Sequence, residues 1–301
     1  MPINAATRYC AVLGHPIRHS ASPALQNTGF KELNVNWRYL AFDVQPDNLR
    51  AAISGAKALK FIGLNLTVPH KLLATAMMDV LDESAKTWGA VNTVCFEAQD
   101  TDGAWRTVGS FIGDVPDKIR TVGYNTDADA ISRSIQDDLK LTLTGAKVLL
   151  LGAGGAGRTA ALKLASDGVS ELFLVNRTRS KAEEIAEEIQ RTFPQVKVTL
   201  GYPPAAIDLV LNATSLGLHP GDASPLTNEL FSLRQAGAVY DMIYRPSETA
   251  LLTAAKAAGC RYSNGLGMLL HQGAKALEIW SGKPAPVAAM RRALETEIYG
   301  D

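Results

Sequence analysis

The sequence lacks the features that mark secreted, membrane-spanning or metal-binding proteins. It has three cysteines in 301 residues, Cys10, Cys95 and Cys260, and they are far apart. An odd and scattered set argues against a disulfide framework and against a CxxC metal site, so we expect no bound metal. The apolar runs are too short to span a bilayer. The first residues show neither the charged nor the apolar region of a signal peptide, and a cytoplasmic location is therefore expected.

An excess of charge of one sign is also missing. Lysine plus arginine number 30, aspartate plus glutamate number 30, and the formal net charge is +0. The chain as a whole therefore has no field that favours nucleic acid or an anionic membrane, and we expect neither as a partner. A composition of 47% hydrophobic and 20% charged residues is typical of a globular protein with a large core. The length allows two domains. The sequence leaves open whether the chain is a monomer or a homodimer.

Short β-rich runs alternate with helical stretches, which predicts βαβ units and mostly parallel sheets. The expected strands are 9–13, 38–44 and 61–67 in a first series, then 147–151, 171–175, 196–200, 209–212 and 239–242 in a second. The expected helices are 24–33, 46–56, 158–167, 180–192, 268–280 and 286–299. The predicted fold class is α/β with two domains: a discontinuous N-terminal α/β domain (1–127 plus 264–301) and a doubly wound Rossmann domain (128–263).

Between the two series lies a polar, weakly periodic stretch, 97–120. It is interpreted as a long hairpin excursion that forms a solvated loop.

A glycine-rich loop follows the apolar strand 147–151 and precedes a helix. Its sequence is Gly152-Ala153-Gly154-Gly155-Ala156-Gly157, which matches GxGxxG. Glycines allow a tight turn and a close approach of the backbone to a pyrophosphate, and the helix N-terminus offers free N–H groups to that anion. With a strand before it and a helix after it, the loop predicts a dinucleotide site; a purely structural turn is the alternative.

The end of the next strand distinguishes NAD from NADP. An NAD enzyme places an acidic residue there, whereas this chain has Asn176-Arg177-Thr178 followed by Lys181. A guanidinium can bind a 2′-phosphate, so NADP is the predicted cofactor and a solvated basic turn is the alternative. Farther along, Thr214 and Ser215 follow another strand, where small hydroxyl residues suit the edge of a dinucleotide crevice.

The segment 63–71 predicts a second site. Asn65 and Thr67 lie on one face of a strand because side chains alternate with period two. Pro69 ends the strand, and Lys71 falls near the N-terminus of the next helix, where the dipole does not favour an ammonium group. A lysine at that place suits acid–base chemistry, although a surface lysine is the alternative.

These motifs together resemble, in the same order, those of the shikimate dehydrogenase family. The segments that carry the resemblance are 14–23, 65–71, 89–93, 123–127, 152–157, 176–178, 212–217, 241–244 and 265–269. They cover nearly the whole chain. The resemblance implies an NADP-binding Rossmann domain, a substrate domain, and NADPH-dependent reversible reduction of 3-dehydroshikimate to shikimate in aromatic amino acid biosynthesis.

The resemblance also implies roles for individual residues. Lys71 and Asp127 would be the catalytic pair, with Lys71 supplying a proton to the ketone oxygen and Asp127 orienting it; taken alone, Asp127 could equally cap a helix. The implied substrate-binding residues are Ser20, Ser22, Asn65, Thr67, Lys71, Asn92, Asp127, Tyr244 and Gln272. The implied cofactor-binding residues are Glu83, Gly152, Ala153, Gly154, Gly155, Ala156, Asn176, Arg177, Thr178, Lys181, Thr214, Ser215, Met242, Gly265 and Met268.

The sequence departs from the family at two places, and two other functions are open. The stretch 97–120 is longer than usual, and Lys181 stands where many members carry arginine. One alternative is a quinate/shikimate dehydrogenase that uses NAD, against which Arg177 argues. The other is a non-catalytic, NADP-sensing binding protein, against which the presence of Lys71 and Asp127 argues.

Overall fold

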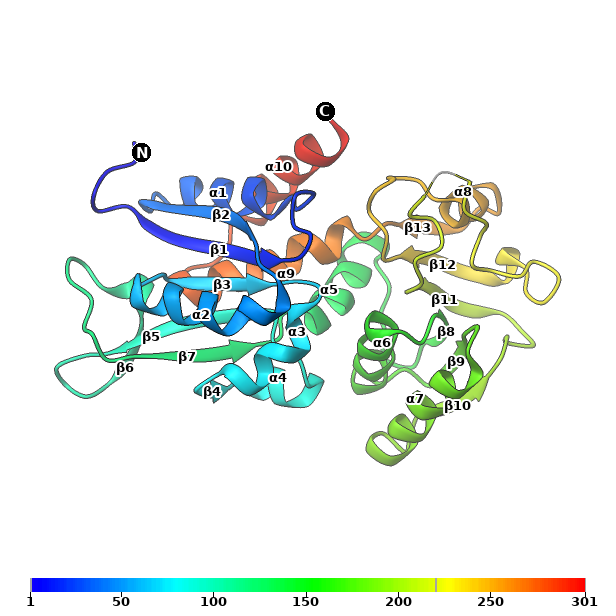
Figure 1. The fold of residues 1–301 in the computed structure, drawn as a ribbon. Coiled ribbons are helices and arrows are strands. Elements are labelled where there is room, and N and C mark those ends of the chain that lie inside the picture. The colour runs from blue at the N-terminus through cyan, green and yellow to red at the C-terminus, as the bar shows by residue number, and fades with distance from the viewer. Residues whose placement is uncertain (1, 220, 301) are drawn as a thin grey trace. The chain divides into compact units, whose positions relative to one another are not determined.

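The computed structural model describes residues 2–219 and 221–300. The chain divides into two compact units, Met1–Asp127 with Leu270–Asp301, and Ala128–Leu269 (Figure 1). The second crossing lies within a helix, α9 (Leu266–Ser281), six residues after the predicted boundary at 263. In the described part of the chain, no helix is both long and apolar enough to cross a membrane.

The first unit is built on one mixed sheet with the strand order β2-β1-β3-β5-β7-β4. The strands are β1 (Arg8–Gly14), β2 (Trp37–Asp43), β3 (Gly63–Leu66), β4 (Val80–Leu81), β5 (Thr93–Gln99) and β7 (Ile119–Tyr124), with β6 (Trp105–Thr107) paired to β5. The expectation of a mostly parallel sheet is wrong at β5, which runs antiparallel to β3, β6 and β7. As a result, Thr93 at the start of β5 is in register with both Asn65 and Tyr124. Polar residues at the ends of three strands thereby meet.

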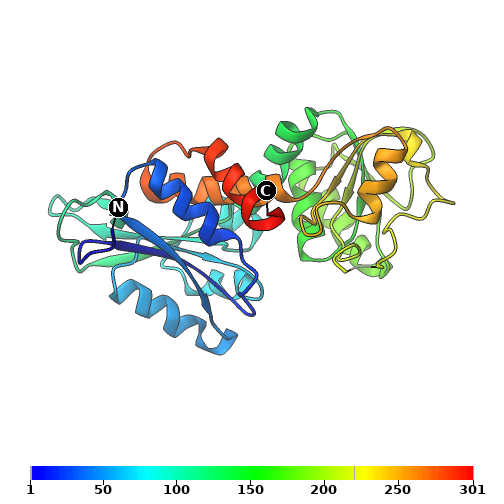
Figure 2. The ribbon, with the colours of Figure 1, turned by 90° about the horizontal axis from the view of Figure 1, so that it is seen from above.

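Helices cover both faces of this sheet. They are α1 (Ser22–Glu32), α2 (Leu49–Ala58), α3 (His70–Leu73), α4 (Glu83–Trp88), α9 and α10 (Val287–Tyr299). Figure 2 shows α1 and α10 on one face and α2 on the other. Trp280 of α9 is fully buried and donates its indole N–H to the carbonyl of Val94 over 3.0 Å. A Cβ at Gly63 would lie 2.0 Å from that indole nitrogen, so glycine is required for this helix to pack on the sheet.

The second unit is a parallel sheet with the order β10-β9-β8-β11-β12-β13. Its strands are β8 (Lys147–Leu151), β9 (Glu171–Val175), β10 (Lys197–Leu200), β11 (Ile207–Asn212), β12 (Ala236–Asp241) and β13 (Arg261–Ser263), and its helices are α5 (Asp127–Leu139), α6 (Gly155–Ser166), α7 (Arg179–Thr192) and α8 (Ala250–Ala257). In chain order this is the 3-2-1-4-5-6 arrangement of a doubly wound fold, which confirms the predicted Rossmann domain. The strand order reverses between β8 and β11, where such folds bind ligands beyond the carboxyl ends of the strands.

The excursion between β5 and β7 is a hairpin, as predicted, but it is more than a solvated loop. Arg8 donates to the carbonyls of Val108 and Gly113 over 2.7 and 2.8 Å. Lys60 donates to the carbonyl of Val115 and pairs with Asp117. These two cations hydrogen-bond to backbone carbonyls that would otherwise need water. They fix the excursion near the carboxyl end of β5, at the far end of that strand from Thr93.

Candidate functional site

Lys71 and Asp127 form an ion pair at one end of the first sheet. The Lys71 ammonium nitrogen lies 2.7 Å from Oδ2 of Asp127, and the two side chains are 33% and 14% exposed. Lys71 lies on α3, which is only four residues long, so the helix dipole that the sequence argument invoked is small. The carboxylate of Asp127, at the first residue of α5, provides the electrostatic environment instead. The pair is accessible enough to meet a ligand and close enough for each group to orient the other.

A buried network of amides and hydroxyls adjoins this pair through Thr126, which directly precedes Asp127. The side-chain N–H₂ group of Asn65 donates to the hydroxyl of Thr93 over 2.9 Å and to the carbonyl of Asn92 over 3.3 Å. Oδ1 of Asn92 accepts from the backbone N–H of Thr126 over 2.8 Å, and its N–H₂ group donates to the Thr126 hydroxyl over 3.0 Å. Because every member has a partner, the network holds the ends of β3, β5 and β7 in one arrangement.

Three residues of this network are not among the site residues predicted from the sequence. Thr93 and Thr126 lie within motifs that were recognised, 89–93 and 123–127, and that placement could have found them. Tyr39 donates its hydroxyl to Oδ1 of Asn65 over 2.7 Å and lies in an ordinary predicted strand, where no sequence signal marks it.

The remaining substrate candidates lie on several elements. Ser22 begins α1, and its backbone N–H donates to the hydroxyl of Ser20 over 3.3 Å. Thr67 follows β3 and is held by a backbone bond to Leu13. Gln272 is half-buried on α9, next to Gly273, whose carbonyl accepts from the buried side chain of Gln26.

Tyr244 belongs to the second unit, where burial raises the pKa of its hydroxyl. Glu83, a cofactor candidate, belongs to the first unit and pairs with Lys86 over 2.6 Å.

The glycine loop has the geometry that a pyrophosphate site needs. Gly152 has a φ of +107°, which a side chain would strain, and its N–H donates to the carbonyl of Val175. A Cβ at Gly157 would lie 2.1 Å from the Gly152 carbonyl oxygen, so only glycine lets α6 start this close to β8. Gly154 and Gly155 are exposed with open space where a Cβ would be. The first N–H groups of α6 have no acceptor within the helix and are free to bind an anion.

The basic turn after β9 is joined to this loop. Asn176 accepts from the backbone N–H of Ala153 over 3.0 Å and donates to the carbonyl of Thr178 over 2.7 Å. Arg177 and Lys181 are exposed, and neither side chain has an ion-pair or hydrogen-bonding partner among the described residues. Cations left unpaired beside a glycine loop are suited to hold a phosphate group, as a 2′-phosphate requires.

The neighbouring basic residue differs: Arg179 pairs with Glu183 over 2.8 Å.

A buried carboxylate, Asp241, holds the loops on the other side of the switch point. It accepts from Asn212 over 2.9 Å, from the N–H of Ile243 over 3.1 Å and from the hydroxyl of Thr249 over 2.7 Å. Burial raises the pKa of Asp241, and these three hydrogen bonds offset only part of the rise. Asp241 lies in the recognised motif 241–244, but no role was predicted for it.

These loops carry several cofactor candidates. Asn212 accepts from both the N–H and the hydroxyl of Thr214, beside Ser215. A Cβ at Gly152 would lie 2.9 Å from the Thr214 methyl carbon, so the two loops touch. A Cβ at Gly265 would lie 2.0 Å from the carbonyl oxygen of Met242, and Met268 follows in the first turn of α9.

Models of known families match three parts of the chain. Residues 12–94 match the shikimate dehydrogenase substrate binding domain, 133–216 match shikimate / quinate 5-dehydrogenase, and 265–295 match the shikimate 5′-dehydrogenase C-terminal domain.

Individual relatives agree along almost the full length. The shikimate dehydrogenase (NADP(+)) of Methanopyrus kandleri is 36% identical over 97% of this chain and 96% of its own. A crystal structure of a shikimate dehydrogenase in complex with NADP+ has a TM-score of 0.84 and 34% identity, covering 99% of this chain and 98% of that one. The Thermus thermophilus enzyme in complex with NADP(H) and shikimate has a TM-score of 0.79 and 34% identity, covering 96% and 99%. This chain belongs to the shikimate dehydrogenase family.

Proposed function

We propose that this protein is an NADP-dependent shikimate dehydrogenase that reversibly reduces 3-dehydroshikimate to shikimate. The observation that carries the proposal is the 2.7 Å pair of Lys71 and Asp127, set among amide and hydroxyl side chains. Family membership supports it, because the Thermus thermophilus relative is seen with NADP(H) and shikimate. Balanced charge and a few scattered cysteines support a cytoplasmic enzyme that acts on a small molecule. The proposed assembly is a monomer or a homodimer.

The substrate is a polyhydroxylated ring with one carboxylate, and the candidate residues offer matching groups. The hydroxyls of Ser20 and Ser22 would hold the carboxylate. Amide and hydroxyl side chains would bind the ring hydroxyls, and these are Asn65, Thr67, Asn92 and Gln272. Tyr244 is a further substrate candidate. Because such groups bind substrate and transition state alike, their loss is expected to appear mainly in KM.

Lys71 would transfer the proton, and Asp127 would orient the Lys71 side chain. When bound, NADPH supplies the hydride that reaches the ketone carbon. The Lys71 ammonium would donate a proton to the ketone oxygen and stabilise the charge that develops there, and it would take the proton back in the oxidative direction. Asp127 holds that ammonium through Oδ2, while its Oδ1 can accept a hydrogen bond from a substrate hydroxyl.

The cofactor would be held by three groups of residues in the second unit. The glycine loop, Gly152 to Ala156, and the start of α6 would bind the pyrophosphate. Arg177 and Lys181 would bind the 2′-phosphate, with Asn176 and Thr178 shaping the turn. The remaining contacts would come from Thr214, Ser215, Met242, Gly265 and Met268. Glu83 is a further cofactor candidate.

A spectrophotometric assay tests this function. Purified protein is incubated with shikimate or quinate, each with NADP⁺ or NAD⁺, and the reduced nicotinamide is followed. Turnover that strongly favours shikimate with NADP⁺ is expected. A preference for quinate or NAD⁺ would place the protein among quinate/shikimate dehydrogenases that use NAD. Absence of turnover in all four combinations would contradict the enzymatic function and favour a binding protein.

A further inference from the structure

The hydroxyl of Tyr39 helps to fix the orientation of the Asn65 amide. Tyr39 donates to Oδ1 of Asn65 over 2.7 Å, and the N–H₂ group of Asn65 points at the carbonyl of Asn92 and the hydroxyl of Thr93. The Asn92 carbonyl can only accept, so the amide nitrogen must face it and Oδ1 must face Tyr39. The phenol therefore supplies the donor that completes one defined orientation of Asn65.

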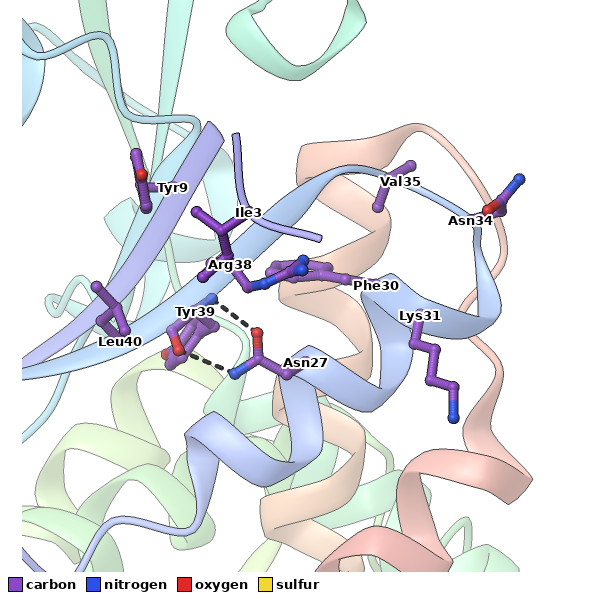
Figure 3. Close-up of a pocket in the computed structure, with 10 residues that line it drawn as sticks. All are labelled: Ile3, Tyr9, Asn27, Phe30, Lys31, Asn34, Val35, Arg38, Tyr39 and Leu40. Carbon is purple, nitrogen blue, oxygen red and sulfur yellow. Dashed lines mark hydrogen bonds between the residues drawn. The ribbon is translucent and has the colours of Figure 1, made fainter. Parts of the chain in front are cut away.

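Tyr39 itself is held rigidly from α1. The side chain of Asn27 accepts from the backbone N–H of Tyr39 and donates to its carbonyl, both over 2.9 Å (Figure 3). The phenol ring packs between Phe30 and Trp280, with ring centroids 6.5 and 6.2 Å away. The side chain is 1% exposed, so its hydroxyl has no access to bulk water. A donor fixed in this way can orient a partner without competition from solvent.

The phenol of Tyr39 stays neutral. Burial holds the pKa of Tyr39 well above its ordinary value; the nearby Cys10 adds to the rise, and the Ser22 side chain opposes it. Tyr39 is thus a neutral donor at working pH, and it donates to Asn65, which is proposed to bind a ring hydroxyl.

We propose that Tyr39 is a positioning residue for shikimate, acting through the amide of Asn65 without touching the substrate. The inference rests on the proposed function and extends it to a residue outside the expected binding set. Loss of the hydroxyl should weaken shikimate binding and leave the chemistry and the cofactor site as they are. The KM for shikimate should therefore rise, with kcat and the KM for NADP⁺ near wild type.

The test is Tyr39→Phe, which removes one oxygen and keeps the ring that packs against Phe30 and Trp280. From the usual net value of a buried hydrogen bond, we expect the KM for shikimate to rise roughly three- to tenfold. Tyr9→Phe is the matched control, because Tyr9 lies on the adjacent strand β1 and its ring contacts Phe61. That variant should keep the wild-type KM.

A double-mutant cycle with Asn65→Ala separates positioning from a general structural role. If Tyr39 acts through Asn65, adding Tyr39→Phe to Asn65→Ala should raise the KM no further. A rise of equal size in both backgrounds would overturn the proposal, as would a wild-type KM in the single variant. Should Tyr39→Phe fail to fold, Asn27→Ala loosens the backbone of Tyr39 instead and should show the same dependence on Asn65.

Failure of this inference is distinguishable from failure of the proposed function. Wild-type protein that does not oxidise shikimate with NADP⁺ would remove the function, and the positioning role with it. Active wild-type protein with an unaffected Tyr39→Phe variant would remove the positioning role alone.

Discussion

The ammonium group of Lys71 and the carboxylate of Asp127 lie 2.7 Å apart although the chain separates them by 56 residues. Lys71 follows β3 and Asp127 follows β7, and β5 runs between these strands in the opposite direction. That arrangement brings the carboxyl ends of β3 and β7 to the same edge of the sheet. The Lys71–Asp127 pair is thus a product of the topology of the first unit.

Asp127→Asn keeps the shape of the side chain and removes its charge. We expect kcat for shikimate oxidation to fall roughly 10- to 100-fold, from the usual value of a hydrogen bond to a charged group. Steady-state kinetics with shikimate and NADP⁺ measure this fall. Asp129→Asn is the control, because Asp129 lies on the same helix and pairs with Lys163 over 3.0 Å. Equal activity of the two variants would show that Asp127 does not orient Lys71.

Arg177→Ala tests the choice of NADP over NAD. Arg177 is exposed and lacks an ion-pair partner among the residues that the structure describes, so its charge is available for a 2′-phosphate. The KM for NADP⁺ should rise roughly 10- to 100-fold while the KM for NAD⁺ stays unchanged, because only NADP⁺ carries that phosphate. Arg179→Ala, which removes a cation already paired with Glu183, should have little effect on either. If the KM values for NADP⁺ and NAD⁺ both increased by the same factor, Arg177 would contribute to folding instead of phosphate recognition.

The raised pKa of Asp241 predicts that the stability of the protein depends on pH. Burial raises the pKa of this carboxyl in the folded state, whereas in the unfolded chain its pKa is about 3.9. The stability that the protonated group contributes is therefore fully present below the unfolded pKa and is lost as the pH rises through the folded pKa. Asp241→Asn removes this loss. Its amide can donate to the hydroxyl of Thr249, which in the wild type donates to the Asp241 carboxylate. Relative to wild type, its free energy of unfolding should therefore increase from pH 4 to pH 7.

Urea unfolding at several pH values measures that difference. Glu184→Gln, an exposed acidic residue on α7, is the control and should show no such trend. Asp241→Ala loses all three hydrogen bonds and should be destabilised by about 3 kcal/mol, at about 1 kcal/mol for each bond. If Asp241→Asn follows the wild-type pH profile, the buried carboxylate is not ionising in the range examined.

Local patterns predicted five of the six strands of the Rossmann unit, and only β13 was not expected. The strands β8 and β9 begin and end where the sequence placed them, because each is a short apolar run buried on both faces. The glycine loop was equally predictable, since Gly152 has a positive φ and Gly157 packs against the carbonyl oxygen of Gly152, and both constraints are local.

Long-range features could not be predicted in this way. The direction of β5 depends on which strands pair, and side-chain periodicity is the same for parallel and antiparallel pairing. Tyr39 meets Asn65 across 26 residues, and Asp241 meets Asn212 across 29, so neither contact leaves a local signature. The length of the helix at Lys71 could not be predicted either: α3 has a single turn, which is too short for the expected helix dipole.

The most direct test of the account is the activity of Lys71→Ala. With NADP⁺ and shikimate, kcat should fall by about 10²- to 10⁴-fold, the usual contribution of a general acid or base, while NADP⁺ still binds as in wild type. Lys57→Ala, which removes a surface lysine paired with Asp79, should remain active. Near-normal turnover by a correctly folded Lys71→Ala variant would contradict the proposed mechanism.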